Sequence, residues 1–160
     1  MPRIETRPLP RASALWSQVQ TGDFIDGYAV RSDLTPREAA DLGLSLPRWA
    51  RALLALRNRI VRPFGLKTGE TAAGTGALFP KTFEDRTELI LGTDDRHLDF
   101  RICIRQERGQ IHMATWVHRH NVIGFIYLAL VMPFHVVITR SAMHRIARAS
   151  PSDGGRIAAD

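Results

Sequence analysis

The chain has 160 residues, of which 44% are hydrophobic and 24% are charged. This length and balance fit one globular domain with its own core and exclude an intrinsically disordered chain. The net charge of +6 comes from scattered residues, nearly all of them arginine, rather than from a basic tail, so we do not expect nucleic acid as a partner.

The single cysteine, Cys103, has no partner for an internal disulfide, which favours a reducing compartment. The first residues, MPRIETRPLPRASALW, carry charge and proline throughout and lack the apolar stretch of an export signal. We therefore expect a cytoplasmic protein, and the sequence gives no reason to expect a cofactor.

Three parts are expected: a loosely structured lead-in (1–22), a single domain (23–149) and a frayed tail (150–160). The segment DFIDGYAVR at 23–31 has the composition of a first strand. In TPREAADLG, a short helix is predicted with Thr35 as cap, Pro36 at its first position and Glu38 completing a capping box. Gly43 can close that helix.

A second helix is predicted from Ser45, its expected cap, to Pro63, which stops it. Four apolar residues recur at helical spacing and four arginines follow the opposite stripe. The apolar residues are Trp49, Leu53, Leu56 and Ile60, and the arginines are Arg48, Arg51, Arg59 and Arg62. A solvated face explains the arginines, and a phosphate-binding or membrane-contacting face stays an alternative.

The glycine-rich segment 65–80 has the Gly69–Gly74 spacing of a phosphate-binding loop, but Thr75 stands where that loop requires lysine. We therefore expect a connection or a pocket lid there.

Residues 87–120 predict a three-stranded antiparallel meander because apolar and polar residues alternate with period two. Turns are expected at Asp94–Asp95 and at Arg108–Gly109. The resulting register places Asp99 between Ile90 and His118, and Arg101 between Glu88 and Trp116, where an ion pair and a stacked arginine are expected. It places His97 between Gly92 and His120, aligns Leu89 with Phe100 and Val117, and aligns Leu91 with Leu98.

The apolar face of this meander is expected to point to the core and the charged face to water. The charged face is then a structural ladder in which Asp99 and His118 can hydrogen-bond across strands. A metal site is the alternative, and its ligands would be His97, Asp99, His118 and His120, with Asp95 as another carboxylate.

A long helix is predicted over 121–149, almost wholly apolar over 122–138 and one-sided after that. Tyr127, Pro133 and His135 interrupt the apolar stretch, which is at the lower limit for a bilayer span. We expect this helix to cover the concave face of the sheet and not to span a membrane; a peripheral membrane contact stays open.

Three stretches occur in order: WARALLALRNRIVRPFGLK at 49–67, LGTDDRHLDFRICI at 91–104 and NVIGFIYLALVMPFH at 121–135. Together they resemble the bacterial domain-of-unknown-function family 2867 over about residues 23–148. The resemblance extends to the helix-grip (START-like, polyketide-cyclase-like) superfamily. It implies an α+β fold in which a curved antiparallel sheet packs on a long C-terminal helix, with two short helices after the first strand. The family pattern usually has arginines where this chain has Phe125 and Val136.

The leading hypothesis is a soluble module that binds a small hydrophobic ligand in a cavity between the sheet and the C-terminal helix; a filled core is the alternative. The expected lining residues are Phe100, Ile102, Met113, Thr115, Phe125 and Phe134. A second hypothesis is a START-like enzyme of the cyclase, hydrolase or isomerase type, with His135 as its candidate acid–base group. A third is a partner-binding accessory protein without a cavity, or a homodimer.

Overall fold

The computed structural model describes residues 3–64 and 79–150. The glycine-rich segment and the tail, for which a connection and fraying were expected, lie almost wholly outside these residues. In chain order the elements are β1 (Glu5–Thr6), η1 (Ala14–Ser17), β2 (Phe24–Ile25), β3 (Tyr28–Arg31), α1 (Pro36–Leu44), α2 (Arg48–Val61), η2 (Arg62–Phe64), β4 (Lys81–Glu84), β5 (Glu88–Asp94), β6 (Leu98–Glu107), β7 (Gln110–Arg119) and α3 (Val122–Ala149).

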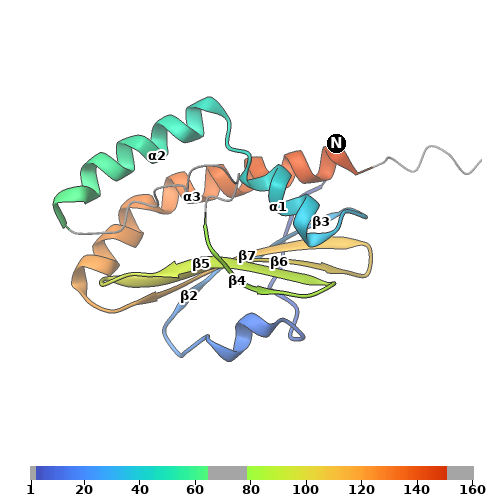
Figure 1. The fold of residues 1–160 in the computed structure, drawn as a ribbon, viewed down its shortest axis with the longest axis horizontal. Helices are drawn as coiled ribbons and strands as arrows, with labels where there is room; N and C mark the ends of the chain where they lie inside the picture. The colour runs from blue at the N-terminus through green and yellow to red at the C-terminus, as the bar shows by residue number, and fades with distance from the viewer. Residues whose placement is uncertain (1–2, 65–78, 151–160) are drawn as a thin grey trace, which may run out of the picture.

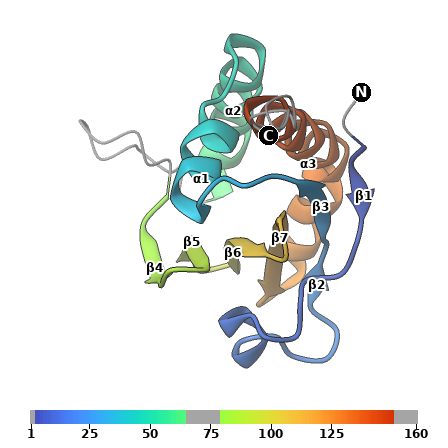
Figure 2. The ribbon, with the colours of Figure 1, turned by 90° about the vertical axis from the view of Figure 1, so that its right-hand side faces the viewer.

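The expected α+β architecture is confirmed. Within the described residues, seven antiparallel strands form one curved sheet in the order β1-β3-β7-β6-β5-β4, and β2 pairs with the far end of β7. α1 and the long α3 lie over one face of the sheet, and α2 lies beyond them next to α3 (Figures 1 and 2). The opposite face carries the N-terminal segment that contains η1 (Figure 1).

The start of α1 follows its local sequence. The Thr35 side chain accepts from the Glu38 backbone, and the Glu38 carboxylate accepts from the Thr35 backbone N–H at 2.8 Å, which confirms the capping box. Gly43 does not close the helix, because α1 continues to Leu44. A Cβ on Gly43 would lie 3.2 Å from Met113 and 3.3 Å from Ile146, so this glycine instead allows α1 to pack closely over the sheet and α3.

The turn between β6 and β7 confirms the register predicted for this pair. Arg108 and Gly109 both have positive φ, 51° and 71°, which suits the right-handed twist of the flanking strands. Phe100 consequently pairs with Val117, and Arg101 pairs with Trp116.

The predicted register of β5 against β6 is wrong by four residues. Glu88 pairs with Arg105 instead of Arg101, because the chain reverses at Arg96–His97 and not at Asp94–Asp95. Asp94 extends β5 instead, and its carboxylate lies 2.7 Å from the Arg101 guanidinium. A shift of four residues is even, so every side chain keeps the face that the sequence predicted.

The main core lies between the sheet and the helices α1 and α3. Its central side chains come from β3, β5, β6, β7 and the C-terminal half of α3. They include Val30, Leu89, Leu91, Ile104, Ile111, Met113, Ala142, Met143 and Ile146. The prediction that the apolar face points toward the terminal helix is therefore confirmed.

The prediction that the opposite face is open to water is wrong at its centre. Leu9, Leu15 and Trp16 cover this face and form a second core with Cys103 and Trp116. The residues expected to form a loose lead-in supply this cover, so both faces of the central strands are buried.

The helices α2 and α3 expose much of their apolar surface. In the predicted stripe of α2, Trp49 is 43% exposed, Leu56 53% and Ile60 54%, whereas Ala50 is fully buried. α2 begins at Arg48 after Pro47, so Ser45 is not its cap. In the described chain, α3 alone is long and apolar enough to cross a bilayer, and only 17% of its apolar window is buried.

Candidate functional site

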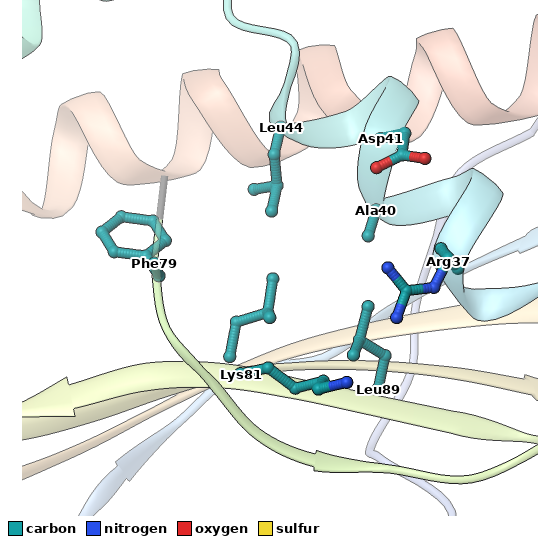
Figure 3. Close-up of a pocket in the computed structure, with 8 residues that line it drawn as sticks. Arg37, Ala40, Asp41, Leu44, Phe79, Lys81 and Leu89 are labelled. Carbon is teal, nitrogen blue, oxygen red and sulfur yellow. The ribbon is translucent and has the colours of Figure 1, made fainter. Parts of the chain in front are cut away.

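A hollow of about 130 Å³ lies on the helix-facing side of the sheet, between α1 and the strands β4 and β5 (Figure 3). Its apolar walls come from Ala40 and Leu44 of α1, Leu89 and Leu91 of β5, and Phe79 just before β4. In Figure 3 the Leu44 side chain points from α1 toward the sheet, into this hollow. We call it the α1 pocket.

Polar residues at the α1 pocket carry charges of both signs. The lining includes Arg37, Lys81 and Asp41, and both cations are paired with Glu84. The Arg37 guanidinium donates to both Glu84 oxygens, at 2.6 and 2.7 Å. Because the two cations and two carboxylates balance, the pocket is not a dedicated anion site.

None of the six residues expected to line a cavity is part of this pocket's lining, but Phe100 and Ile102 lie next to residues that are. The Phe79 ring packs edge-on against Phe100 with ring centroids 4.9 Å apart. Leu91 pairs with Ile102 across the β5–β6 ladder. The other four expected residues lie elsewhere: Met113 is buried in the main core, Thr115 lies beside Asp26, and Phe125 and Phe134 are 53% and 48% exposed on α3.

His135 forms a hydrogen-bonded pair with a carboxylate that the sequence did not single out. Its Nε2 lies 2.7 Å from Asp26 Oδ2, and the two side chains are 22% and 15% exposed. Asp26 Oδ1 accepts from the backbone N–H of Thr115 at 2.7 Å, which fixes the carboxylate on β7. Phe24 lies edge-on to the imidazole. This geometry holds the imidazole ring in one orientation, which a group that transfers protons needs.

A groove of about 390 Å³ lies beside the β2–β3 connection. Pro8, Leu9, Trp16, Ile25 and Tyr28 supply most of its apolar lining, and Asp26 also borders it. Burial raises the pKa of Tyr28, and the nearby Asp26 charge acts in the same direction. The groove is larger than the α1 pocket and lies between the N-terminal segment and the strands β2 and β3.

The four residues of the metal alternative are divided among separate partners. His118 Nδ1 lies 2.6 Å from Asp23 and His120 Nε2 lies 3.0 Å from Asp99, so the expected Asp99–His118 hydrogen bond is replaced by two other pairs. His97 is buried and its Nδ1 lies 3.2 Å from the amide oxygen of Asn121. No cluster of three or more potential metal ligands occurs in residues 3–64 and 79–150.

Asp23 is the centre of a polar cluster with His118 and Trp116. Burial acts to raise its pKa, but hydrogen bonds from His118, the Gln20 backbone and Trp116 together hold the pKa below its ordinary value. The Trp116 indole donates to Asp23 at 2.9 Å. The cluster ties the segment before β2 to the end of β7.

Glu88 is a buried carboxyl at the interface between the N-terminal segment and the sheet. It is 1% exposed and accepts from the Ser13 hydroxyl, the Cys103 thiol and the Ala14 backbone N–H. Arg105 lies 3.5 Å away, where Arg101 had been expected. Arg101 instead lies over the Trp116 ring, 5.9 Å from its centroid, as predicted. Burial raises the pKa of the Cys103 thiol far above its ordinary value, so this cysteine is structural.

A family model described as "Protein of unknown function (DUF2867)" matches residues 19–142. The chain belongs to the DUF2867 family. The matched range of this DUF2867 chain runs from just before β2 into the last turns of α3, so it contains the α1 pocket and the His135–Asp26 pair. The η1 segment that covers the second face of the sheet precedes it. No curated protein and no solved structure matches the chain.

Proposed function

We propose that this protein binds a small hydrophobic ligand, and that an apolar group of the ligand enters the α1 pocket. The observation that carries the proposal is the pocket itself, with its walls of Leu44, Phe79, Leu89 and Leu91. A cavity of about 150 Å³ lined by apolar side chains holds a benzene-sized molecule, so 130 Å³ suits a group near that size.

Neighbouring side chains favour a ligand that extends past the pocket. Phe100 and Ile102 are half-buried next to it on the same face of the sheet. Because the charges at the pocket balance, we expect recognition through apolar contact, with the ligand's polar end left toward water. Cytoplasmic action is part of this proposal and rests on the one buried, unpaired cysteine.

The proposal is tested by titrating benzene into the protein and following backbone amide signals by NMR. We expect saturable shifts at Leu44, Leu89 and Leu91. Leu44 is half-buried at the rim of the pocket, so the larger side chain in Leu44→Trp should fill the pocket and abolish these shifts. Leu56→Trp makes the same change on the exposed side of α2 and should preserve them. Unchanged shifts in Leu44→Trp would place benzene elsewhere and overturn the proposal.

A second candidate is acid–base catalysis by His135, favoured by its 2.7 Å contact with Asp26. The carboxylate fixes the orientation of the ring, so Asp26→Asn would impair a reaction in which the imidazole moves a proton. A panel of ester, lactone and enolisable carbonyl substrates is the test: turnover lost in His135→Gln supports catalysis, and no turnover by the native protein removes this candidate.

A further inference from the structure

The first four turns of α3 present an apolar face directed away from the sheet. Its exposed members follow helical spacing, and Leu128, on the opposite side, packs into a core cluster against Leu98 and Val117. The exposed residues and their exposed fractions are Val122 (70%), Ile126 (55%), Leu130 (63%), Phe134 (48%) and Val137 (55%). A contiguous apolar face of this kind on a folded domain marks an interaction surface.

α2 lies next to α3 and also exposes apolar side chains. The Arg57 guanidinium donates to the Tyr127 hydroxyl at 2.6 Å and lies 5.0 Å from the Tyr127 ring centre, which joins the two helices. Trp49, Leu56 and Ile60 on α2 are each more than 40% exposed. α2 lies beyond α1 and alongside α3, so the two helices are neighbours on the helix-covered side of the sheet, as Figure 2 shows; we call their exposed surface the outer layer.

The charge of this layer is of one sign. Residues 48–62 contain five arginines and residues 122–149 contain three, and neither segment contains Asp or Glu. Beyond the apolar turns, Arg140, His144 and Arg148 continue along exposed positions of α3. Apolar and aromatic side chains combined with arginine and no acid are the composition of helices that lie in the interface of an anionic bilayer.

We propose that α2 and the N-terminal half of α3 dock this protein on the surface of an anionic lipid bilayer. The apolar side chains enter the interface and the arginines meet lipid phosphates. α3 lies on the membrane rather than across it, because its C-terminal half supplies Ala142, Met143 and Ile146 to the main core. A span would have to remove these side chains from the protein.

A second copy of the chain fits this layer less well than lipid does. A two-fold interface places the same surface of both copies together, so the arginines of each copy would meet no carboxylate from these two helices in the other copy. Nucleic acid would satisfy the arginines but leave the apolar face in water. An anionic bilayer satisfies both features.

The test is sedimentation of the full chain with vesicles of phosphatidylcholine alone and with 30% phosphatidylglycerol. We expect binding to the anionic vesicles only, weakened by added salt. Arg48→Gln with Arg51→Gln should weaken it about 25-fold, since each arginine near an anionic surface contributes about fivefold. Arg31→Gln, an exposed arginine on β3, is the matched control and should have little effect.

Leu130→Glu tests the apolar part, and it should weaken vesicle binding at least about tenfold because a side chain of this size no longer enters the interface. Phe83→Glu places the same charge at an exposed position on β4 and should leave binding unchanged. Equal binding to both vesicle types, or none, would overturn the proposal. So would a lipid-free dimer that Leu130→Glu dissociates in sedimentation velocity.

Failure of this proposal is separable from failure of ligand binding. The pocket-filling Leu44→Trp variant should bind vesicles like the native protein, because Leu44 lies at the α1 pocket between the helices and the sheet. Loss of vesicle binding in that variant would show that the two surfaces are not independent.

Discussion

Glu88→Ala should release the N-terminal segment from the sheet. The substitution removes the acceptor of the Ser13 hydroxyl, the Cys103 thiol and the Ala14 N–H, the last at 2.9 Å. It also leaves Arg105, whose side chain is 11% exposed, without its carboxylate partner at 3.5 Å. Each of these groups would stay buried or partly buried without its partner.

The size of the effect follows from these contacts. A buried N–H left unpaired costs about 1–3 kcal/mol, and breaking a buried ion pair costs about 3–5 kcal/mol. The losses share one carboxyl and are not additive, so we expect the free energy of unfolding to fall by about 4 kcal/mol. For a domain of this size, about 2–4 °C per kcal/mol converts this to a fall in Tm of about 8–16 °C.

Urea unfolding followed by circular dichroism measures the change, and limited proteolysis tests its location. Cleavage within residues 10–20 should accelerate in Glu88→Ala. Glu88→Gln keeps the volume and one acceptor oxygen, so its loss should be smaller. Glu84→Ala is the control, because its partners Arg37 and Lys81 remain exposed. A Glu88→Ala protein whose unfolding free energy is within about 1 kcal/mol of the native value, with unchanged proteolysis, would show that Glu88 does not hold the N-terminal segment on the sheet.

Three further outcomes follow from individual contacts. The pKa of Asp23 is lowered in the folded state, so this carboxylate stabilises the protein at pH values above the ordinary pKa of 3.8, and the stabilisation is lost as the pH falls through the lower folded pKa. The difference in urea midpoint between the native protein and Asp23→Asn should therefore shrink between pH 5 and about pH 2. Burial lowers the pKa of His112 below its ordinary value of 6.5, so the folded state binds fewer protons at this residue than the unfolded state, and stability should fall as the pH drops below about 6.5. His112→Gln should reduce the change of Tm with pH in that range, and an unchanged slope would contradict this expectation. Arg145 donates to the carbonyls of Leu42 and Gly43 at the end of α1, at 3.1 and 2.8 Å. Arg145→Met should lower the unfolding free energy by about 1–3 kcal/mol, and it should speed amide hydrogen exchange in α1 more than in the other elements.

Local rules explain what the sequence predicted correctly. The capping box at Thr35 and the positive-φ turn at Arg108–Gly109 depend on residues a few positions apart, and they specify the start of α1 and the β6–β7 register. The period-two alternation specifies which face each side chain takes. Even the four-residue error in β5 kept the faces, because only an odd shift exchanges them.

The errors come from contacts between distant parts of the chain. Residues 1–22 lack periodicity, so nothing local shows that Leu15 and Trp16 cover the sheet. His135 and Asp26 are 109 positions apart, and their pairing depends on how α3 crosses the β2–β3 connection. The Asp26–Gly27 step could have indicated a break in the expected first strand, since such steps favour turns.

The most direct test of ligand binding is a crystal of the native protein soaked with bromobenzene, in which the bromine gives an anomalous signal. We expect a bromine peak between Leu44, Phe79 and Leu91, inside the α1 pocket. A peak only on the outer face of α3, or a pocket closed by its own side chains, would contradict it.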